Sequence, residues 1–124
     1  MKIIHIDDSR LAIKCTQLFL QSVFNDACIN SYLTSEFIEL IKSDKTFDDT
    51  DIIITDLLMP DITGQDIIKY VRSVNNKIFI TVLSSNIQHG EKMLAFENGC
   101  DYFLEKPATL EKIQKLREVF YAKR

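Results

Sequence analysis

Short apolar stretches alternate along the chain with longer segments whose apolar residues recur every three or four positions. The clearest short stretch is Ile52–Ile54, three β-branched residues inside the sequence DIIITDLLMPDITG of Asp51–Gly64. An unbroken apolar run is typical of a strand buried on both faces, as in a parallel sheet covered by helices. Four more stretches are predicted as strands, the second of them poorly marked: Lys2–Ile6, Ala27–Tyr32, Ile78–Leu83 and Tyr102–Leu104.

Five segments between these strands have the periodicity of amphipathic helices. They are Arg10–Phe24, Ser35–Ser43, Gln65–Val74, Gln88–Glu97 and Thr109–Ala122. Ser9, Ser35 and Thr109 stand where a side-chain oxygen can cap the first turn. The spacing predicts that these helices bury one apolar side, which includes Leu11, Cys15, Leu18 and Phe19 in the first, Met93, Leu94 and Phe96 in the fourth, and Leu110 in the last.

Strand and helix alternate five times, which favours a single α/β domain. Crossovers between parallel strands are right-handed, and they place helices on both faces of one sheet. The length of 124 residues fits one domain with a single sizeable core.

Polar residues mark the point where four of the strands end. Asp7 and Asp8 follow the first strand, Asp56 the third, Ser84 the fourth and Lys106 the fifth. In a parallel sheet these ends share one edge, and ligands of open α/β sheets bind in the crevice beyond it. The sequence therefore predicts that these five residues meet.

Three carboxylates and one ammonium give this edge a local charge of −2. Two carboxylates about 4 Å apart repel each other by roughly 4 kcal/mol at an effective dielectric constant near 20. Oxygen ligands of this kind suit Mg²⁺, which keeps several waters and shares phosphate oxygens with its substrate. A carboxylate beside Mg²⁺ and a lysine can attack phosphorus and become an acyl phosphate, with the Ser84 hydroxyl donating to a phosphoryl oxygen.

Composition narrows the classes of partner. The net charge of −3 does not indicate the basic surface that binds nucleic acid. No apolar run approaches the roughly 20 residues that span a bilayer. The N-terminus enters a strand at once, without the pattern of a signal peptide. The cysteines are odd in number and form no C-x-x-C pair, so we expect reduced, buried thiols in a cytoplasmic protein; they are Cys15, Cys28 and Cys100.

The stretches IIHIDDSR, DIIITDLLMPDITG, ITVLSS and NGCDYFLEKP together resemble the receiver domain of two-component response regulators, the CheY-like family. The resemblance covers residues 1–124 and implies a flavodoxin-like (βα)5 fold with sheet order 2-1-3-4-5. It implies that Asp56 is the phosphoacceptor and that Mg²⁺ is held by Asp7, Asp8, Asp56 and the backbone carbonyl of Leu58. It also implies that Lys106 contacts the phosphoryl group and has a cis bond to Pro107. Ser84 and Phe103 would be the switch residues, whose side chains move on phosphorylation.

The resemblance also implies a signalling role. The chain would take a phosphoryl group from a sensor histidine kinase or a histidine phosphotransfer protein. Phosphorylation would change the surface of the last two helices and the last strand, and so control a partner protein, as in chemotaxis or a phosphorelay. The only chemistry would be its own phosphorylation and dephosphorylation. A chain of this length would form a single-domain regulator, unless it is one piece of a larger one.

Two alternatives come from other classes of protein. A receiver-like docking module would never be phosphorylated. A phosphatase of the haloacid dehalogenase type would need an Asp-x-Asp pair after the first strand, whereas Asp7 and Asp8 are adjacent. Leu58 and Asn86 flank the site where side chains tune the phosphoryl lifetime; because Leu58 is apolar and cannot orient an attacking water, we expect slow self-dephosphorylation. For His5 and His89, packing or solvent exposure is the expected role.

Overall fold

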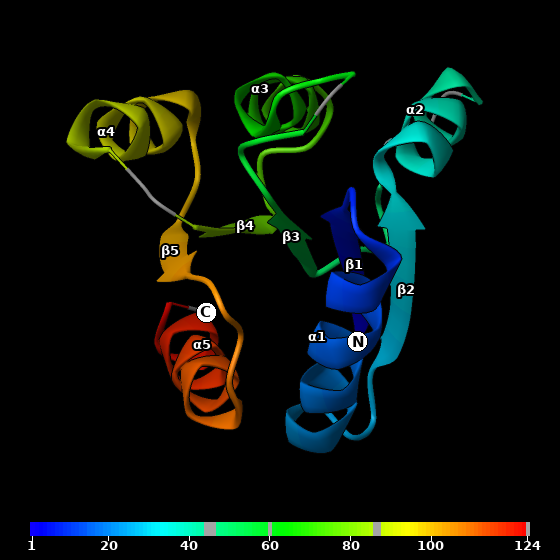
Figure 1. Cartoon of the computed structure of the whole chain (residues 1–124). Coiled ribbons are helices and arrows are strands. Elements are labelled where there is room, and N and C mark those ends of the chain that lie inside the picture. Colours follow the sequence, from blue (N-terminus) through cyan, green and yellow to red (C-terminus); the bar gives the residue numbers. More distant parts are fainter. Residues whose placement is uncertain (44–46, 60, 86–87, 124) are drawn as a thin grey trace.

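The computed structural model describes residues 1–43, 47–59, 61–85 and 88–123. Strands and helices alternate along them (Figure 1). The strands are β1 (Lys2–Asp7), β2 (Cys28–Leu33), β3 (Ile52–Thr55), β4 (Phe79–Ser84) and β5 (Tyr102–Glu105). The helices are α1 (Arg10–Val23), α2 (Thr34–Lys42), α3 (Gly64–Val74), α4 (His89–Asn98) and α5 (Leu110–Ala122). Each strand and helix that the sequence predicts is present, with no end displaced by more than one residue.

The sheet is parallel throughout, in the order β2-β1-β3-β4-β5. Helices α1 and α5 lie on one face, and α2, α3 and α4 lie on the other (Figure 1). This confirms the predicted α/β class and the flavodoxin-like order. Because β3 is in the middle, the residue after it lies at the centre of the edge where the strands end.

The core has two halves, one on each face of the sheet, and alternate residues of a strand point into each. On β3, Ile53 packs under α2 and α3, whereas Ile52 and Ile54 pack under α1 and α5. All three isoleucines are fully buried. The continuous apolar run therefore has the physical origin that the sequence suggests: both faces of this strand are covered.

The helix ends follow local capping chemistry. The Ser9 and Thr109 side-chain oxygens accept hydrogen bonds from the backbone N–H groups of Ala12 and Lys112, as predicted. The predicted cap at Ser35 is wrong: α2 begins at Thr34, directly after β2, and Glu36 accepts the N–H of Leu33 at 2.7 Å. No loop separates β2 from α2, so the helix begins two residues earlier than it would with Ser35 as its cap.

Several helix faces were predicted wrongly. Helix α1 buries Thr16 and Leu20, while Leu11 and Leu18 are 73% and 70% exposed. In α4 only Ala95 is buried. Further residues expected inside are exposed: Met93, Leu94, Phe96, Leu110, Cys15 and Cys28; Cys100 is buried as expected. Periodicity shows that a helix has an apolar stripe, but α1 carries apolar residues on more than one side, and the sheet selects among them.

Among the residues that the structure describes, no helix has both the length and the apolar character that a membrane crossing requires.

Candidate functional site

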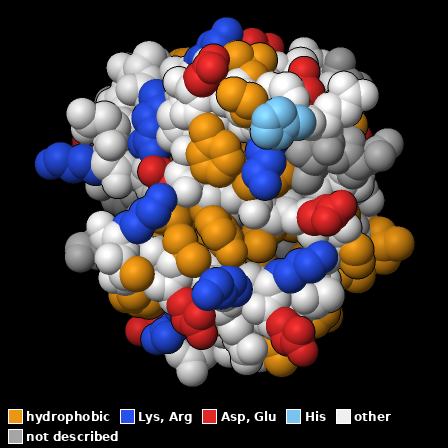
Figure 2. Space-filling view, turned by 90° about the vertical axis from the view of Figure 1, so that its left-hand side faces the viewer, with side chains coloured by type: hydrophobic (Ala, Val, Ile, Leu, Met, Phe, Trp, Pro, Cys, Tyr) orange, Lys and Arg blue, Asp and Glu red, His pale blue; other side chains and the backbone are white. Residues whose placement is uncertain are grey.

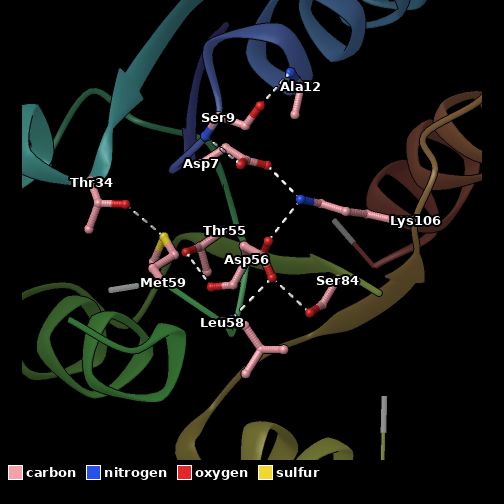
Figure 3. Close-up of polar contacts among 10 residues, drawn as sticks. All are labelled: Asp7, Ser9, Ala12, Thr34, Thr55, Asp56, Leu58, Met59, Ser84 and Lys106. Carbon is pink, nitrogen blue, oxygen red and sulfur yellow. Dashed lines mark hydrogen bonds and ion pairs between the residues drawn. The ribbon is translucent and has the colours of Figure 1, made fainter. Parts of the chain in front are cut away.

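The loops that follow β1, β3, β4 and β5 meet at the carboxyl edge of the sheet (Figure 3). The Lys106 ammonium lies between two carboxylates, 2.8 Å from Asp7 Oδ2 and 2.8 Å from Asp56 Oδ2. Ser84 Oγ donates to Asp56 Oδ1 at 2.7 Å. Residues up to 99 positions apart in the sequence are thus in direct contact.

Asp56 is held at the centre of this group by contacts to both of its oxygens. Oδ1 accepts the Ser84 hydroxyl and also the backbone N–H of Leu58, at 3.2 Å, while Oδ2 faces Lys106. The side chain lies in the mouth of the site and Asp56 is only 6% exposed. Burying a carboxylate with so little water would be costly without these charged and polar partners.

Gly64 fixes the loop that carries Asp56. Its N–H donates to Leu57 O at 3.0 Å, which closes the turn between β3 and α3. A Cβ atom on Gly64 would lie 2.1 Å from the carbonyl oxygen of Asp56. The backbone approach is thus possible only because this residue has no side chain.

Three carboxylates form a group able to hold a metal ion. One oxygen each from Asp7, Asp8 and Asp56 lies within 4.8 Å of the others. Asp7 is buried and Asp8 is exposed; Asp7 Oδ1 also accepts the Ser9 N–H at 3.1 Å. Hard oxygen donors from few carboxylates fit Mg²⁺, and the exposed side leaves room for water and phosphate ligands.

Burial and neighbouring charges at this edge shift the pKa values of Asp7, Asp8 and Lys106. Burial alone would raise the pKa of Asp7, but the hydrogen bond and positive charge of Lys106 outweigh it and lower that pKa. Desolvation and the adjacent Asp7 carboxylate raise the pKa of Asp8. Burial would lower the pKa of Lys106, but the two carboxylates hold it above its usual value. The single positive charge of Lys106 offsets only part of the charge of Asp7 and Asp56, so with Asp8 the edge keeps a net charge of −2 that favours a cation.

The other residues singled out in the sequence lie close by. The Lys106–Pro107 bond is cis, as the resemblance implied. Phe103 is half-buried against the core under α3 and α4, with its ring centroid 6.5 Å from that of Phe96. Leu58 is 65% exposed beside the site, and its carbonyl belongs to the same loop as Asp56. Asn86 falls outside the described residues.

Of the cavities on the described part of the surface, one adjoins this group and a larger one lies far from it. One of about 380 Å³ is lined by Asp8, Leu58 and Thr63 and adjoins the acidic edge. A larger polar one, of about 1020 Å³, is lined by residues such as Asp51, Lys77 and Asp101. Those three precede their strands, so the larger cavity is at the opposite edge of the sheet and takes no part in the acidic site.

Two polar residues near the site are buried: His5, which agrees with the packing role expected from the sequence, and Gln65, for which the sequence gave no expectation. His5 is 1% exposed, and its Nδ1 atom has no hydrogen-bond partner among the described residues. Gln65, next to Gly64, is 8% exposed and contacts α4. For His5, its position as a polar residue inside an apolar strand indicated burial. Gln65 gave no such indication, because a glutamine in the first turn of a helix is ordinarily solvated.

The sequence model of the response regulator receiver domain matches residues 3–118. The chain belongs to this family. Its sheet order and its acidic edge are therefore those of a receiver domain, and its homologues are two-component response regulators. The arrangement does not favour the phosphatase alternative.

Individual relatives agree with this assignment. The response regulator MprA of Mycobacterium avium is 26% identical over 114 residues, which cover 91% of this chain and 47% of that protein. The two-component response regulator ORR2 of Oryza sativa is 32% identical over 70 residues, covering 55% of this chain and 28% of that protein. The chain thus spans at most about half the length of these relatives. A receiver domain protein from Clostridium thermocellum has the same fold, with a TM-score of 0.82 at 20% identity, covering 98% of this chain and 95% of that one.

Proposed function

We propose that this receiver domain is a phosphoacceptor and that Asp56 takes the phosphoryl group. The observation that carries the proposal is the position of the Asp56 carboxylate, 2.8 Å from the Lys106 ammonium and 2.7 Å from the Ser84 hydroxyl, with carboxylate oxygens of Asp7 and Asp8 nearby. A nucleophile, a cation, a hydroxyl donor and a set of metal ligands are what phosphoryl transfer to a carboxylate needs.

In the proposed transfer, an Asp56 carboxylate oxygen forms a bond to phosphorus. The bond from phosphorus to the histidine nitrogen of the donor breaks, and that nitrogen keeps the electron pair. Lys106 has three N–H groups, and two of them contact Asp7 and Asp56. The third can donate to a phosphoryl oxygen, as can the Ser84 hydroxyl. Charge that develops on the transferred group is thereby stabilised.

Asp7, Asp8, Asp56 and the carbonyl of Leu58 are the proposed ligands of Mg²⁺. When bound, the ion supplies Lewis-acid stabilisation of the phosphoryl oxygens and neutralises the excess negative charge of the edge. Within the chain, the buried Asp7 is oriented by Ser9 and Lys106, whereas Asp8 is exposed beside it.

The proposed output surface is the face formed by α4, β5 and α5. Figure 2 shows hydrophobic side chains gathered at the centre of this face, with lysine and arginine side chains around them. Met93, Leu94 and Phe96 of α4 are exposed, and Phe103 of β5 lies next to Phe96. Phosphorylation would draw Ser84 toward the phosphoryl group and let Phe103 repack, which changes this surface. The target is a partner protein of a chemotaxis-type or phosphorelay system in the cytoplasm.

The proposed donor surface is α1. This helix begins three residues after Asp7, so it lies beside the opening of the site. Leu11 and Leu18, seven positions apart on α1, are both exposed, and apolar residues at this spacing suit contact with a helix of a histidine kinase or phosphotransfer protein. The unit proposed to act in this way is one receiver domain over residues 1–124.

The experiment is intact mass spectrometry after incubation with acetyl phosphate and Mg²⁺. We expect one phosphoryl adduct on the wild type and none on Asp56→Asn. Asp61→Asn is the matched control: it changes an exposed carboxylate of the same loop and should still be phosphorylated. A wild-type protein without an adduct, and without a spectral response to beryllofluoride, would support the docking module instead.

A further inference from the structure

Helix α4 is held to the rest of the molecule by little apolar contact. Ala95 is its one buried residue, and its larger apolar side chains are exposed. A cavity of about 490 Å³ separates its first turn from the loop after β3, with Leu57, Ser84, Glu91 and Leu94 among the lining residues. Other contacts must therefore fix the position of α4.

A single buried amide supplies such contacts at both ends of α4. Gln65 Nε2 donates to Glu91 O at 2.9 Å and to Glu91 Oε2 at 3.3 Å, in the first turn. Gln65 Oε1 accepts from Asn98 Nδ2 at 2.8 Å, at the last residue of the helix. Both polar atoms of the Gln65 side chain are thus used on the neighbouring helix, which lies beside α3 (Figure 1).

Gln65 is also linked to the phosphoacceptor. It follows Gly64, which packs against the Asp56 carbonyl and donates to Leu57 O. A displacement of the loop that carries Asp56 therefore moves the first turn of α3, and with it the backbone of Gln65. Because the backbone of Gly64 is in close contact with the Asp56 carbonyl, the loop cannot move without also moving the start of α3.

We propose that Gln65 is a positioning residue that couples the phosphoacceptor loop to α4, separately from the Ser84 and Phe103 switch. The proposal rests on the phosphoacceptor function above. Its hydrogen bonds hold the two ends of α4 against α3, and they carry movement of the loop after β3 to the helix that presents the exposed apolar residues.

The test uses Gln65→Met, which keeps the shape of the side chain and removes its hydrogen bonds, and Asn98→Ala, which releases one end only. Gln114→Met, on the exposed side of α5, is the matched control. Amide hydrogen exchange is measured in each protein, and amide chemical shifts are recorded with and without beryllofluoride and Mg²⁺.

We expect exchange in residues 89–98 to become about tenfold faster in Gln65→Met, as for the loss of one to two hydrogen bonds, and less so in Asn98→Ala. In Gln65→Met, beryllofluoride should still shift the amides around Ser84 and Lys106, whereas the response of α4 should fall to about half. Gln114→Met should match the wild type in both measurements.

Two results would overturn the coupling. Exchange that accelerates equally in all helices would assign Gln65 to general stability, and an unchanged α4 response to beryllofluoride would show that Gln65 transmits nothing. A wild type that does not respond to beryllofluoride at all contradicts the phosphoacceptor function, and the coupling with it. Faster exchange confined to α4 would then still identify Gln65 as the residue that holds this helix.

Discussion

At the scale of single residues, Lys106 determines the electrostatics of the site. Its ammonium contacts both buried carboxylates, Asp7 and Asp56, at 2.8 Å. These carboxylates would otherwise repel each other in a poorly hydrated environment. The lowered pKa of Asp7 and the raised pKa of Lys106 have this one contact in common as a cause.

His5 makes the protein sensitive to mild acid. Burial lowers its pKa from 6.5 to about 4, so the unfolded chain binds a proton that the folded chain rejects. The contribution of the neutral His5 to the unfolding free energy is complete above pH 6.5, and it is lost as the pH drops from 6.5 toward 4. We expect the unfolding free energy, measured in urea, to fall by about 2 kcal/mol from pH 7 to pH 5.

The control is His5→Val, which places an apolar β-branched residue at this position of β1 and should remove most of this loss. The lowered pKa of Asp7 acts only below the usual range of a carboxyl group, so it does not contribute between pH 7 and pH 5. An equal loss of stability in His5→Val would show that another group titrates there.

Leu58 sets the lifetime of the proposed aspartyl phosphate. Its side chain is exposed beside Asp56 and has no atom that can orient water, so we expect a half-life longer than a minute at neutral pH with Mg²⁺. Leu58→Asn should shorten the half-life about tenfold, the effect of one hydrogen bond in the transition state. Loss of the adduct over time, followed by mass spectrometry, measures both rates; Leu58→Met should retain the slow rate.

At the scale of secondary-structure elements, the ends of the strands and the starts of the helices carry the function. Asp7, Asp56 and Ser84 each lie at or directly after the last residue of a strand. The sheet fixes where these residues lie, and all three are buried at the edge where the loops form the opening of the site. Helix α3 begins directly after the loop that carries Asp56 and supports it through Gly64.

Two glycines should respond in opposite ways to alanine. In Gly64→Ala the new Cβ would lie 2.1 Å from Asp56 O, so the loop must move; we expect a loss of about 3 kcal/mol in unfolding free energy and slower phosphorylation by acetyl phosphate. In Gly90→Ala, in α4, the new Cβ meets nothing within 4 Å, and stability should rise by up to about 1 kcal/mol. Similar losses in both variants would contradict the close approach at Gly64.

At the scale of the whole molecule, one sheet edge collects charged residues from three separate segments, at the ends of β1, β3 and β5. The twisted parallel order places β3 between β1 and β4, so Asp56 lies between the acidic pair and the Ser84 hydroxyl. Folding therefore assembles an anionic group that no single segment contains, and a bound cation should stabilise the folded state as a whole.

Mg²⁺ should raise the unfolding free energy by about 1.4 kcal/mol at a concentration ten times its dissociation constant. Asp8→Asn should abolish that gain. Because the pKa of Asp8 is raised in the fold, its charge is unfavourable there, and the variant should be more stable than the wild type when EDTA is present. Thermal unfolding of both proteins in Mg²⁺ and in EDTA gives the four values; an Asp8→Asn protein that still gains from Mg²⁺ would exclude Asp8 as a ligand.

Much of the fold could be predicted because local physics dictates it. The run Ile52–Ile54 specifies a doubly buried strand, and five alternations of strand and helix leave few other topologies. The five polar residues at the strand ends could be brought together by the same rule, before any coordinates. The wrong faces of α1 and α4 arise because exposure depends on which neighbour covers a helix, and periodicity does not contain that information.

The sequence by itself determined the alternation of elements, the parallel sheet and the set Asp7, Asp8, Asp56, Ser84 and Lys106, because each follows from burial or from where a strand ends. Only the tertiary structure decided that Lys106 bridges Asp7 and Asp56, that Gly64 touches the Asp56 backbone, and that Gln65 holds both ends of α4. The contacts of Lys106 and Gln65 join segments distant in sequence, and that of Gly64 closes a loop. Their distances depend on how the helices pack against the sheet, and no local pattern of residues specifies that packing.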